Sequence, residues 1–499
     1  MLLAAHFAQD LANLEQKPDW KIADAASSLS GRSKSESQNG SRGSNLNSSS
    51  YAWRNRRSEH TVRILIAIAA VALLLRLMPL LQPGAGWTLG NDSARYVELA
   101  SGLRAGCGFA RLDGGVCGPP ETLRTPGYPL FLAAFSKPRI VVAAQAVLGA
   151  ATCLIVGYFT ATRWGFAAGA AAEIFLALDI PSIVSGAMVM SDTLFQLLLT
   201  LGILLEMLAI DANYPRLRRL CLVTVAGLSL GAAILVRPIG ILLPFLALLP
   251  FVASTPSRLK AQLHLAVIVI FIPAAVGVGW AARNYYRTGM WTLSTISAYN
   301  LYFFRAGGVI WFSEGGDFRQ IQKTLERNLD LAPSQSPRNI DAQMDHLMVA
   351  RSLKIISAHP FQFLRMSLTS LLWLAIVPDR ANLMIVMSTH DASIPFTPAG
   401  ALANRIKTAL RSPTITALLS FQLASILVIW IGVARALLSP GARRGELIVL
   451  VFIALTMLAL ASGSEAQARL RTPAIPFLAI AAGAGWFRTG QARRPFEAS

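Results

Sequence analysis

Long apolar runs recur along almost the whole chain, and short polar segments separate them. An α-helix needs about 20 apolar residues to cross a bilayer. We therefore predict an all-α polytopic membrane protein, a helical bundle of about 10–12 crossings with further helices in its outer loops. Ten runs are taken as crossings, at 62–82, 139–161, 166–183, 190–210, 220–236, 239–254, 263–283, 413–436, 446–463 and 472–487.

The two ends of the chain are polar. Ser27 to Ser50 is rich in Ser, Gly and Asn and has too little apolar surface to fold alone. Residues 1–60 are therefore predicted to be a disordered cytoplasmic tail, and 489–499 a short cytoplasmic one. The start of the chain lacks the charged and apolar regions of a cleavable signal, so the first crossing is expected to act as an uncleaved anchor.

Arginines in alternate loops predict the orientation. Cytoplasmic loops are enriched in Lys and Arg, which places both termini inside and Arg163, Arg219 and Arg443 in inner loops. The transmembrane domain 61–488 then has an outer loop at 83–138 and an outer cap at 284–412.

The apolar stretch Phe361 to Val377 cannot cross alone, because both ends of the outer cap are predicted outside. We interpret it as an interfacial or re-entrant helix. A second short crossing through Ala381 to Ser388 would also restore the parity, so ten and twelve crossings both stay open.

Composition agrees with a membrane protein. Hydrophobic residues make up 54% of the chain, charged residues only 14%, and the mean hydropathy is +0.50. The net charge of +19 comes mostly from short loops, so it indicates orientation rather than nucleic-acid binding. The GxGxxG and GxxxxGK[ST] phosphate loops are absent from the sequence, which argues against a cytoplasmic nucleotide site.

Ionisable residues gather in the predicted outer segments, where orientation does not explain the arginines. Arginine forms bidentate hydrogen bonds with phosphate, so several on one face favour a lipid-phosphate ligand. The simpler alternatives are an arginine that reaches the interface, or an aspartate that caps the following helix. The candidates are Asp92, Tyr96, Arg124, Asp192, Arg237, Arg283, Glu465, Arg469 and Arg471.

Four segments in this order resemble the GT-C glycosyltransferases, most closely the bacterial members related to protein mannosyltransferases and to the aminoarabinose transferase of lipid A. The resemblance covers roughly residues 60 to 487. One departure is Asp92-Ser93, where the family often has Asp-Glu. The segments are Gly90 to Tyr96 with Thr125 to Ala133, Met190 to Phe195, Arg283 to Tyr285, and Ala468 to Pro476.

The resemblance implies an enzyme that takes a sugar from a polyprenyl-phosphate carrier and passes it to an acceptor hydroxyl outside the cytoplasm. Asp92 would be the general base, and Asp192 the second acidic position. Tyr96 and Arg124 would belong to the acceptor pocket.

The same resemblance implies a group of arginines at the donor phosphate: Arg469 and Arg471, with Arg237 and Arg283 behind them. The expected location is a bacterial inner membrane, with the site on the periplasmic face. The acceptor is left open as a lipid, a glycan or a protein, and the donor sugar as a hexose or a pentose.

Cys107 and Cys117 both fall in the first outer loop, and we predict a disulfide between them. No group of residues has structural-zinc spacing, and no metal site is predicted. A Mg²⁺ ion bridging Asp92 and the donor phosphate is left open, and no other cofactor is expected.

Two other functions stay open. A secondary transporter or flippase of lipid-linked sugars would use charges inside the membrane, and Arg76, Glu173 and Asp179 are such residues. A ligase or polymerase of lipid-linked glycans would also use outer arginines.

Overall fold

A computed structural model describes most of the chain after the first 41 residues. The chain divides into two units, Met1–Ser58 and Glu59–Ser499, and the candidate site lies in the second. The predicted C-terminal tail, Glu465, and the predicted N-terminal tail up to Ser41 lie outside the described residues. These are 42–81, 89, 92–211, 214–252, 256–329, 342–387, 413–441, 443–464 and 466–487.

Helix α2 covers Arg42–Leu77, so it begins inside the predicted tail. The polar residues at its start are helical because they continue the apolar run that follows. Adding a residue to an existing helix costs less free energy than nucleating a new helix.

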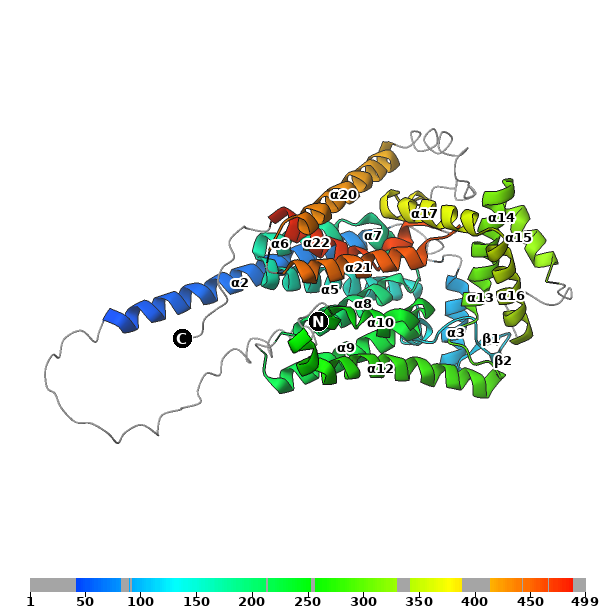
Figure 1. Ribbon diagram of the computed structural model, residues 1–499, viewed down its shortest axis with the longest axis horizontal. Coiled ribbons are helices and arrows are strands. Elements are labelled where there is room, and N and C mark those ends of the chain that lie inside the picture. The colour runs from blue at the N-terminus through cyan, green and yellow to red at the C-terminus, as the bar shows by residue number, and fades with distance from the viewer. Residues whose placement is uncertain are drawn as a thin grey trace. The chain divides into compact units, whose positions relative to one another are not determined.

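Seven described helices are long and apolar enough to cross a membrane, by length and composition. Apart from one two-stranded hairpin, the regular structure of the described residues is helical. The prediction of an all-α polytopic membrane protein is confirmed, and Figure 1 shows the long helices side by side. The seven spans are Glu59–Leu81 (α2 and η1), Pro138–Trp164 (α5), Asp192–Ala209 (α8), Arg216–Val236 (α9), Gln262–Thr288 (within α12, Pro256–Thr288), Pro413–Leu438 (α20) and Arg444–Ala461 (α21).

The third predicted crossing is bent. Helices α6 (Phe166–Ala177) and α7 (Ile180–Ala187) meet at 49°. Pro181 lies in the first turn of α7, where its ring favours the start of a new helix over the continuation of α6.

The sixth and last predicted crossings are shorter than expected. The sixth is broken into η3 (Pro238–Leu242), α10 (Leu243–Leu246) and α11 (Leu249–Val252). The last, α22 (Ile475–Phe487), has 13 residues and a length of about 20 Å, below the ~30 Å of a bilayer core. Helix α22 is buried among α5, α6, α20 and α21.

The stretch predicted to be interfacial or re-entrant forms α17 (Pro360–Ile376), followed by the seven-residue α18 (Arg380–Val386). Helix α18 is about 10 Å long and cannot cross a bilayer by itself. Ser388, the end of the alternative short crossing, lies outside the described residues.

Residues from the predicted inner loops lie together at one end of the bundle. At the end of α5, Arg163 donates to the Met207 carbonyl and to Glu446 Oε1, both at 3.1 Å. At the start of α9, Arg219 donates to the Ala209 carbonyl at 2.8 Å. The ends of α5 and α8 therefore lie beside the starts of α9 and α21.

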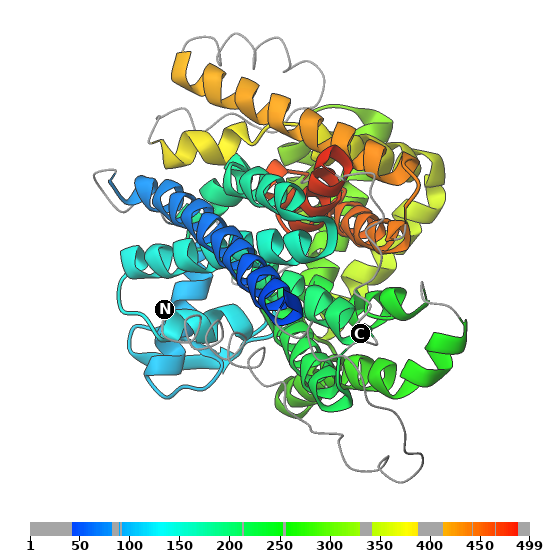
Figure 2. The same ribbon diagram turned by 90° about the vertical axis from the view of Figure 1, so that its left-hand side faces the viewer.

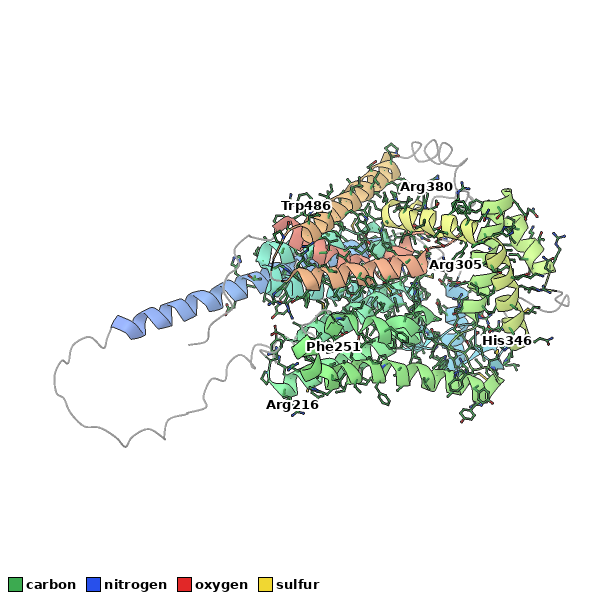
Figure 3. All side chains as sticks on the ribbon, in the orientation of Figure 1. Arg216, Phe251, Arg305, His346, Arg380 and Trp486 are labelled. Atoms are coloured by element: carbon green, nitrogen blue, oxygen red, sulfur yellow. A yellow bond between two sulfur atoms is a disulfide. The ribbon has the colours of Figure 1, made fainter. Side chains whose placement is uncertain are left out.

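The predicted outer segments gather at the opposite end (Figure 1; Figure 2 gives the perpendicular view). In Figure 3, Arg216 marks the first end, and Arg305 and His346 mark the second. The elements there are α3 (Ser93–Arg104), β1 (Ala110–Asp113), β2 (Val116–Pro120), α4 (Gly127–Ala133), α13 (Ile296–Asn300), η4 (Leu301–Ala306), α14 (Gly307–Glu314), α15 (Phe318–Arg327) and α16 (Ala342–Ala358).

The outer cap is joined to the first outer loop by packing. Tyr302, Leu325 and Met348 form a buried apolar cluster that includes Leu123. The Ser294 hydroxyl donates to the Leu123 carbonyl at 2.5 Å.

The orientation can be tested by cysteine labelling. In a variant whose exposed Cys221 is replaced by Ser, we expect Ser136→Cys, just before α5, to react with an impermeant maleimide on intact spheroplasts. Ser439→Cys, just after α20, should react only after permeabilisation. Both side chains are exposed, and they lie at opposite ends of the bundle, which the predicted topology places on opposite sides of the membrane. Labelling of both from the same side would contradict the predicted topology.

Candidate functional site

Asp92 lies directly before α3 and is paired with Arg124. Arg124 Nη2 donates to Asp92 Oδ1 at 2.7 Å, and the guanidinium lies over the Tyr96 ring, 5.3 Å from its centroid. Although Asp92 occupies the N-cap position, its side chain makes no capping hydrogen bond. Its carboxylate is partly exposed, so the three residues that were predicted to belong together form one polar group at the surface of the loop.

Arg124 stays fully charged in this position. Burial alone would lower its pKa, but Tyr96, Asp92 and Glu121 outweigh the burial and raise it. The carboxylate of Asp92 therefore faces a permanent positive charge.

Glu121 is a site residue that the sequence analysis missed. It is 4% exposed and accepts two hydrogen bonds from Arg95, at 3.0 and 3.1 Å. Its Oε1 also accepts from the Leu123 backbone N–H at 2.6 Å, one residue before Arg124. The sequence did contain a signal for Glu121, because it is an acidic residue three positions before the candidate Arg124.

Arg283 binds backbone groups of the outer loop. It donates to the carbonyls of Phe109 and Glu121, both at 3.2 Å, and to Asn284 Oδ1 at 2.9 Å. Its guanidinium also lies over the Trp280 ring, 4.8 Å from the centroid. The donors of Arg283 therefore hold the hairpin.

Asp192 and Arg237 form a buried ion pair. Arg237 Nη2 lies 2.7 Å from Asp192 Oδ1, and Asp192 is fully buried. Arg237 Nε donates to Ser191 Oγ at 3.0 Å. The second acidic position is therefore neutralised by the arginine at the end of α9.

The two acidic motifs are brought together by hydrogen bonds across the bundle. Ser93 Oγ donates to the Val189 carbonyl at 2.9 Å. Tyr128 donates to Gln145 Oε1 at 2.7 Å, and Gln145 Nε2 donates to the Met188 carbonyl, also at 2.7 Å. The start of α3 is thus held against the segment that precedes Asp192.

Gly127 is required where α4 meets the end of α9. A Cβ atom at this position would lie 2.8 Å from the Leu235 carbonyl oxygen and 2.9 Å from Val236. This close approach of α4 to α9 brings the Tyr128 ring into edge-to-face contact with the Tyr96 ring, with centroids 4.9 Å apart.

Arg471, in η5 (Ala468–Arg471), is fully buried. Its Nη1 donates to the carbonyls of Leu374 and Val377, but Nε and Nη2 have no hydrogen-bond partner among the described residues. Burial lowers its pKa, and Asp179 and Asp379 oppose that effect. A buried donor without a partner costs about 1–3 kcal/mol, and more when charged. The two unpaired nitrogens of Arg471 therefore carry a free-energy cost that a bound acceptor would remove.

Arg469 is partly exposed, and its buried Nε also has no partner in the described part of the chain. The late motif is tied to α8, because Gln196 Nε2 donates to the Thr472 carbonyl at 2.7 Å. Gln196 lies one turn after Asp192, so the late motif and the second acidic motif lie side by side.

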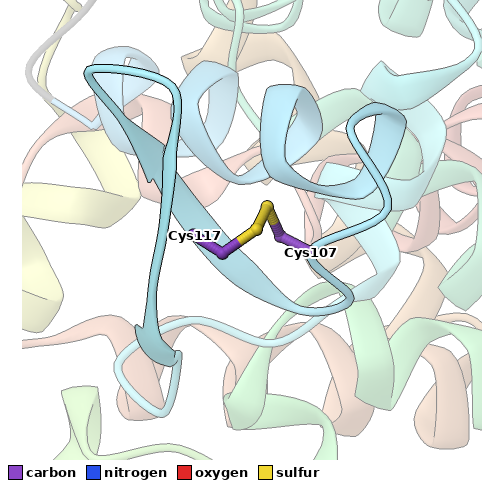
Figure 4. The surroundings of a disulfide bond; sticks show 2 residues. All are labelled: Cys107 and Cys117. Atoms are coloured by element: carbon purple, nitrogen blue, oxygen red, sulfur yellow. A yellow bond between two sulfur atoms is a disulfide. The ribbon is translucent and has the colours of Figure 1, made fainter.

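The structure joins Cys107 and Cys117 by a disulfide, with a Cα–Cα distance of 5.4 Å (Figure 4). It links the turn after α3 to β2, so the hairpin stays beside the helix that Asp92 precedes. Gly102 of α3 allows this contact, because a Cβ there would clash with the Ala110 carbonyl oxygen.

The described residues contain no group of three or more His, Cys, Asp or Glu side chains that could hold a metal ion. Asp92 offers a single carboxylate, which is already paired with Arg124.

Charges within the apolar helices have mixed roles. Arg76 donates to the carbonyls of Leu176 and Ala177, which end α6. Asp179 caps α7 by accepting from the backbone N–H of Ser182 at 3.0 Å. The carboxylates of Glu173 and Glu206 are buried, with no hydrogen-bond partner among residues that the structure describes.

No protein-family model matches this chain, and neither does any curated protein. Among solved structures, it is similar to the oligosaccharyltransferase AglB from Archaeoglobus fulgidus, in complex with an inhibitory peptide and a dolichol-phosphate. The TM-score is 0.49 at 12% identity, over 86% of this chain and 50% of AglB, so the chain spans about half the length of that protein.

It is also similar to ArnT from Cupriavidus metallidurans bound to undecaprenyl phosphate. The TM-score is 0.40 at 15% identity, over 85% of this chain and 77% of ArnT. Both are GT-C glycosyltransferases, the class whose motifs the sequence resembles.

Breaking the buried ion pair should destabilise the fold. Arg237→Met leaves the Asp192 carboxylate buried without its counter-charge, and we expect a loss of about 3–5 kcal/mol. Adding Asp192→Asn should restore part of it. The measurement is the free energy of unfolding in detergent micelles, and a double variant no more stable than Arg237→Met would contradict the pairing.

Proposed function

We propose that the chain is a membrane glycosyltransferase. It moves a sugar from a polyprenyl-phosphate donor to an acceptor hydroxyl on the periplasmic face of a bacterial inner membrane, with both termini in the cytoplasm. The observation that supports this most is that a partly exposed carboxylate, Asp92, and a buried guanidinium with unpaired donors, Arg471, occur at the same end of one apolar bundle.

Asp92 is the general base of the proposed reaction. It accepts the proton of the acceptor hydroxyl while that oxygen forms a bond to the anomeric carbon of the sugar. Arg124 Nη2 donates to the carboxylate at 2.7 Å and fixes its orientation beside the acceptor. Tyr96 and Arg124 then form one side of the acceptor pocket.

The leaving group is the lipid phosphate. Its negative charge grows as its bond to the anomeric carbon breaks, so fixed cations at the phosphate stabilise the transition state more than the ground state. Arg469 and Arg471 are suited to this task because some of their donors are unpaired. Arg237 and Arg283 have their donors on Asp192 and on backbone carbonyls, which supports a role behind the phosphate site.

The donor sugar is proposed to be a hexose or a pentose, and the acceptor a lipid, a glycan or a protein. The alternative is a transporter or flippase of lipid-linked sugars. Among the described residues of the apolar helices, Glu173 and Glu206 favour it, because their buried carboxylates have no hydrogen-bond partner there. Arg76 and Asp179 do not support it, because they cap helix ends.

Asp92→Asn tests the base. The carboxamide keeps the shape of the side chain but cannot accept the proton, so sugar transfer from a polyprenyl-phosphate donor should fall by about 10²–10⁴-fold. The matched control is Glu98→Gln, which removes an exposed carboxylate from the same helix and should leave transfer unchanged. Equal rates for wild type and Asp92→Asn would rule out the proposed base.

Arg469→Ala tests the phosphate site. We expect the KM for the lipid donor to rise about tenfold or more while the KM for the acceptor changes little, because a charge-assisted hydrogen bond to phosphate is lost. Steady-state kinetics with each substrate varied in turn measures this. An equal rise in both KM values would move the phosphate site elsewhere.

A further inference from the structure

An open crevice runs along α21 at the end of the bundle opposite the candidate site. Its volume is about 310 Å³, and it lies on the candidate membrane spans α20 and α21. Water is absent from a bilayer core, so an apolar crevice at that depth is filled by another apolar group. The crevice is lined by Leu437, at the end of α20, and by Arg444, Ile448, Val451, Phe452 and Leu455 of α21.

The crevice exists because α20 packs mainly on α22 and not on α21. Two glycines allow this packing, since a Cβ atom at Gly485 of α22 would clash with the Gly432 carbonyl oxygen of α20. Helices α20 and α21 meet at their connection and diverge toward the other end of the bundle (Figure 1 and Figure 2). The exposed side chains of Ile448, Phe452 and Leu455 are therefore left without a protein partner along this stretch of α21.

The crevice has the depth of one lipid leaflet. Arg444 is the first residue of α21, and Leu455 lies about three turns, or about 17 Å, further along the helix. Half of the ~30 Å hydrocarbon core of a bilayer is about 15 Å. An acyl chain laid along these residues would therefore reach from the headgroup level to the middle of the bilayer.

A positive charge lies at the headgroup end of the crevice. Arg444 is exposed, and its side chain forms no hydrogen bond or ion pair with the described residues. The acid in the same turn, Glu446, is already neutralised, because its Oε1 accepts from Arg443 at 2.9 Å and from Arg163 at 3.1 Å. The guanidinium of Arg444 is thus free to form charge-assisted hydrogen bonds with an anion.

We propose that this crevice binds an anionic phospholipid, with one acyl chain along α21 and the headgroup phosphate at Arg444. Cytoplasmic arginines are common in membrane proteins, so orientation alone would explain Arg444. Orientation does not explain an apolar crevice of leaflet depth that begins at this arginine, whereas a basic pocket between helices suits an anionic lipid headgroup. The predicted topology makes the leaflet cytoplasmic. The site lies away from the proposed reaction and does not depend on it.

The test is native mass spectrometry of the purified full chain, delipidated in a maltoside detergent and titrated with lipids of identical acyl chains. Phosphatidylglycerol is the anionic probe and phosphatidylcholine the zwitterionic one. We expect the first phosphatidylglycerol to bind at least tenfold more tightly, because its net negative charge is left for Arg444. Glycerol 3-phosphate, which has the phosphate but no acyl chain, should not displace it.

Equal affinity for the two lipids would overturn the proposal, because the crevice would then hold any lipid. Displacement by glycerol 3-phosphate at equal concentration would assign the arginine to a free phosphate instead. A dimer of the chain that binds no lipid would assign the crevice to a second copy.

Arg444→Ala tests the headgroup contact. The affinity for phosphatidylglycerol should fall about tenfold, to that for phosphatidylcholine, because a charge-assisted hydrogen bond is lost. The matched control is Arg216→Ala, which removes an exposed arginine from the start of α9 at the same end of the bundle (Figure 3). This control should bind as wild type does, and an equal loss in it would reduce the effect to net charge.

Ile448→Trp tests the acyl-chain contact. The larger side chain fills the crevice and leaves Arg444 in place, so both lipids should bind about tenfold more weakly. Leu228→Trp adds the same ring to an exposed apolar position of α9 and should leave binding unchanged. Unchanged binding in Arg444→Ala and Ile448→Trp, or an equal loss in Leu228→Trp, would reject the site. Sugar transfer is not a readout in any of these measurements, so the site and the proposed function fail separately.

Discussion

The predicted outer loop that carries Asp92 and Arg124 depends on one arginine near the end of α12, Arg283. Arg283 donates to the carbonyls of Phe109 and Glu121, the residues on either side of the hairpin. Near a bilayer, water is scarce and backbone carbonyls need donors from the protein itself. Because Arg283 supplies them, the hairpin closes, and the segment after it runs directly toward Asp92.

Glu121 links the hairpin that Arg283 holds to the residues around Asp92. Its side chain holds Arg95 of α3 and the backbone N–H of Leu123, which places Arg124 beside Asp92. On the far side of α3, hydrogen bonds through Tyr128 and Gln145 hold the loop to the segment before Asp192. A carboxylate fixed from two sides can present its oxygens in one geometry, as a general base requires.

The sequence predicted the helices well and the partners of the side chains poorly. Bilayer thickness imposes the length of apolar runs, so most spans were readable, and the bend at Pro181 follows from proline chemistry. The position of Arg283 near the end of an apolar run was readable too, but its acceptors were not. A guanidinium has five donors, and only the folded chain decides whether they meet a carbonyl, an acid or a ligand. Glu121 was missed because only the folded chain brings its carboxylate to Arg95 and to the Leu123 backbone N–H.

The arginines at this end of the bundle therefore divide by what their donors meet. Arg124, Arg237 and Arg283 each pair with an acid or a carbonyl, although Arg124 also keeps a buried Nε without a partner among the described residues. Arg471 is the most deeply buried, yet it keeps two nitrogens unpaired. Burial without a partner is costly for a charged group, so such a residue persists when a ligand supplies the acceptor. In the proposed reaction the lipid phosphate is that ligand, so the two unpaired nitrogens of Arg471 support the proposed binding role, which the predicted side of the membrane alone does not.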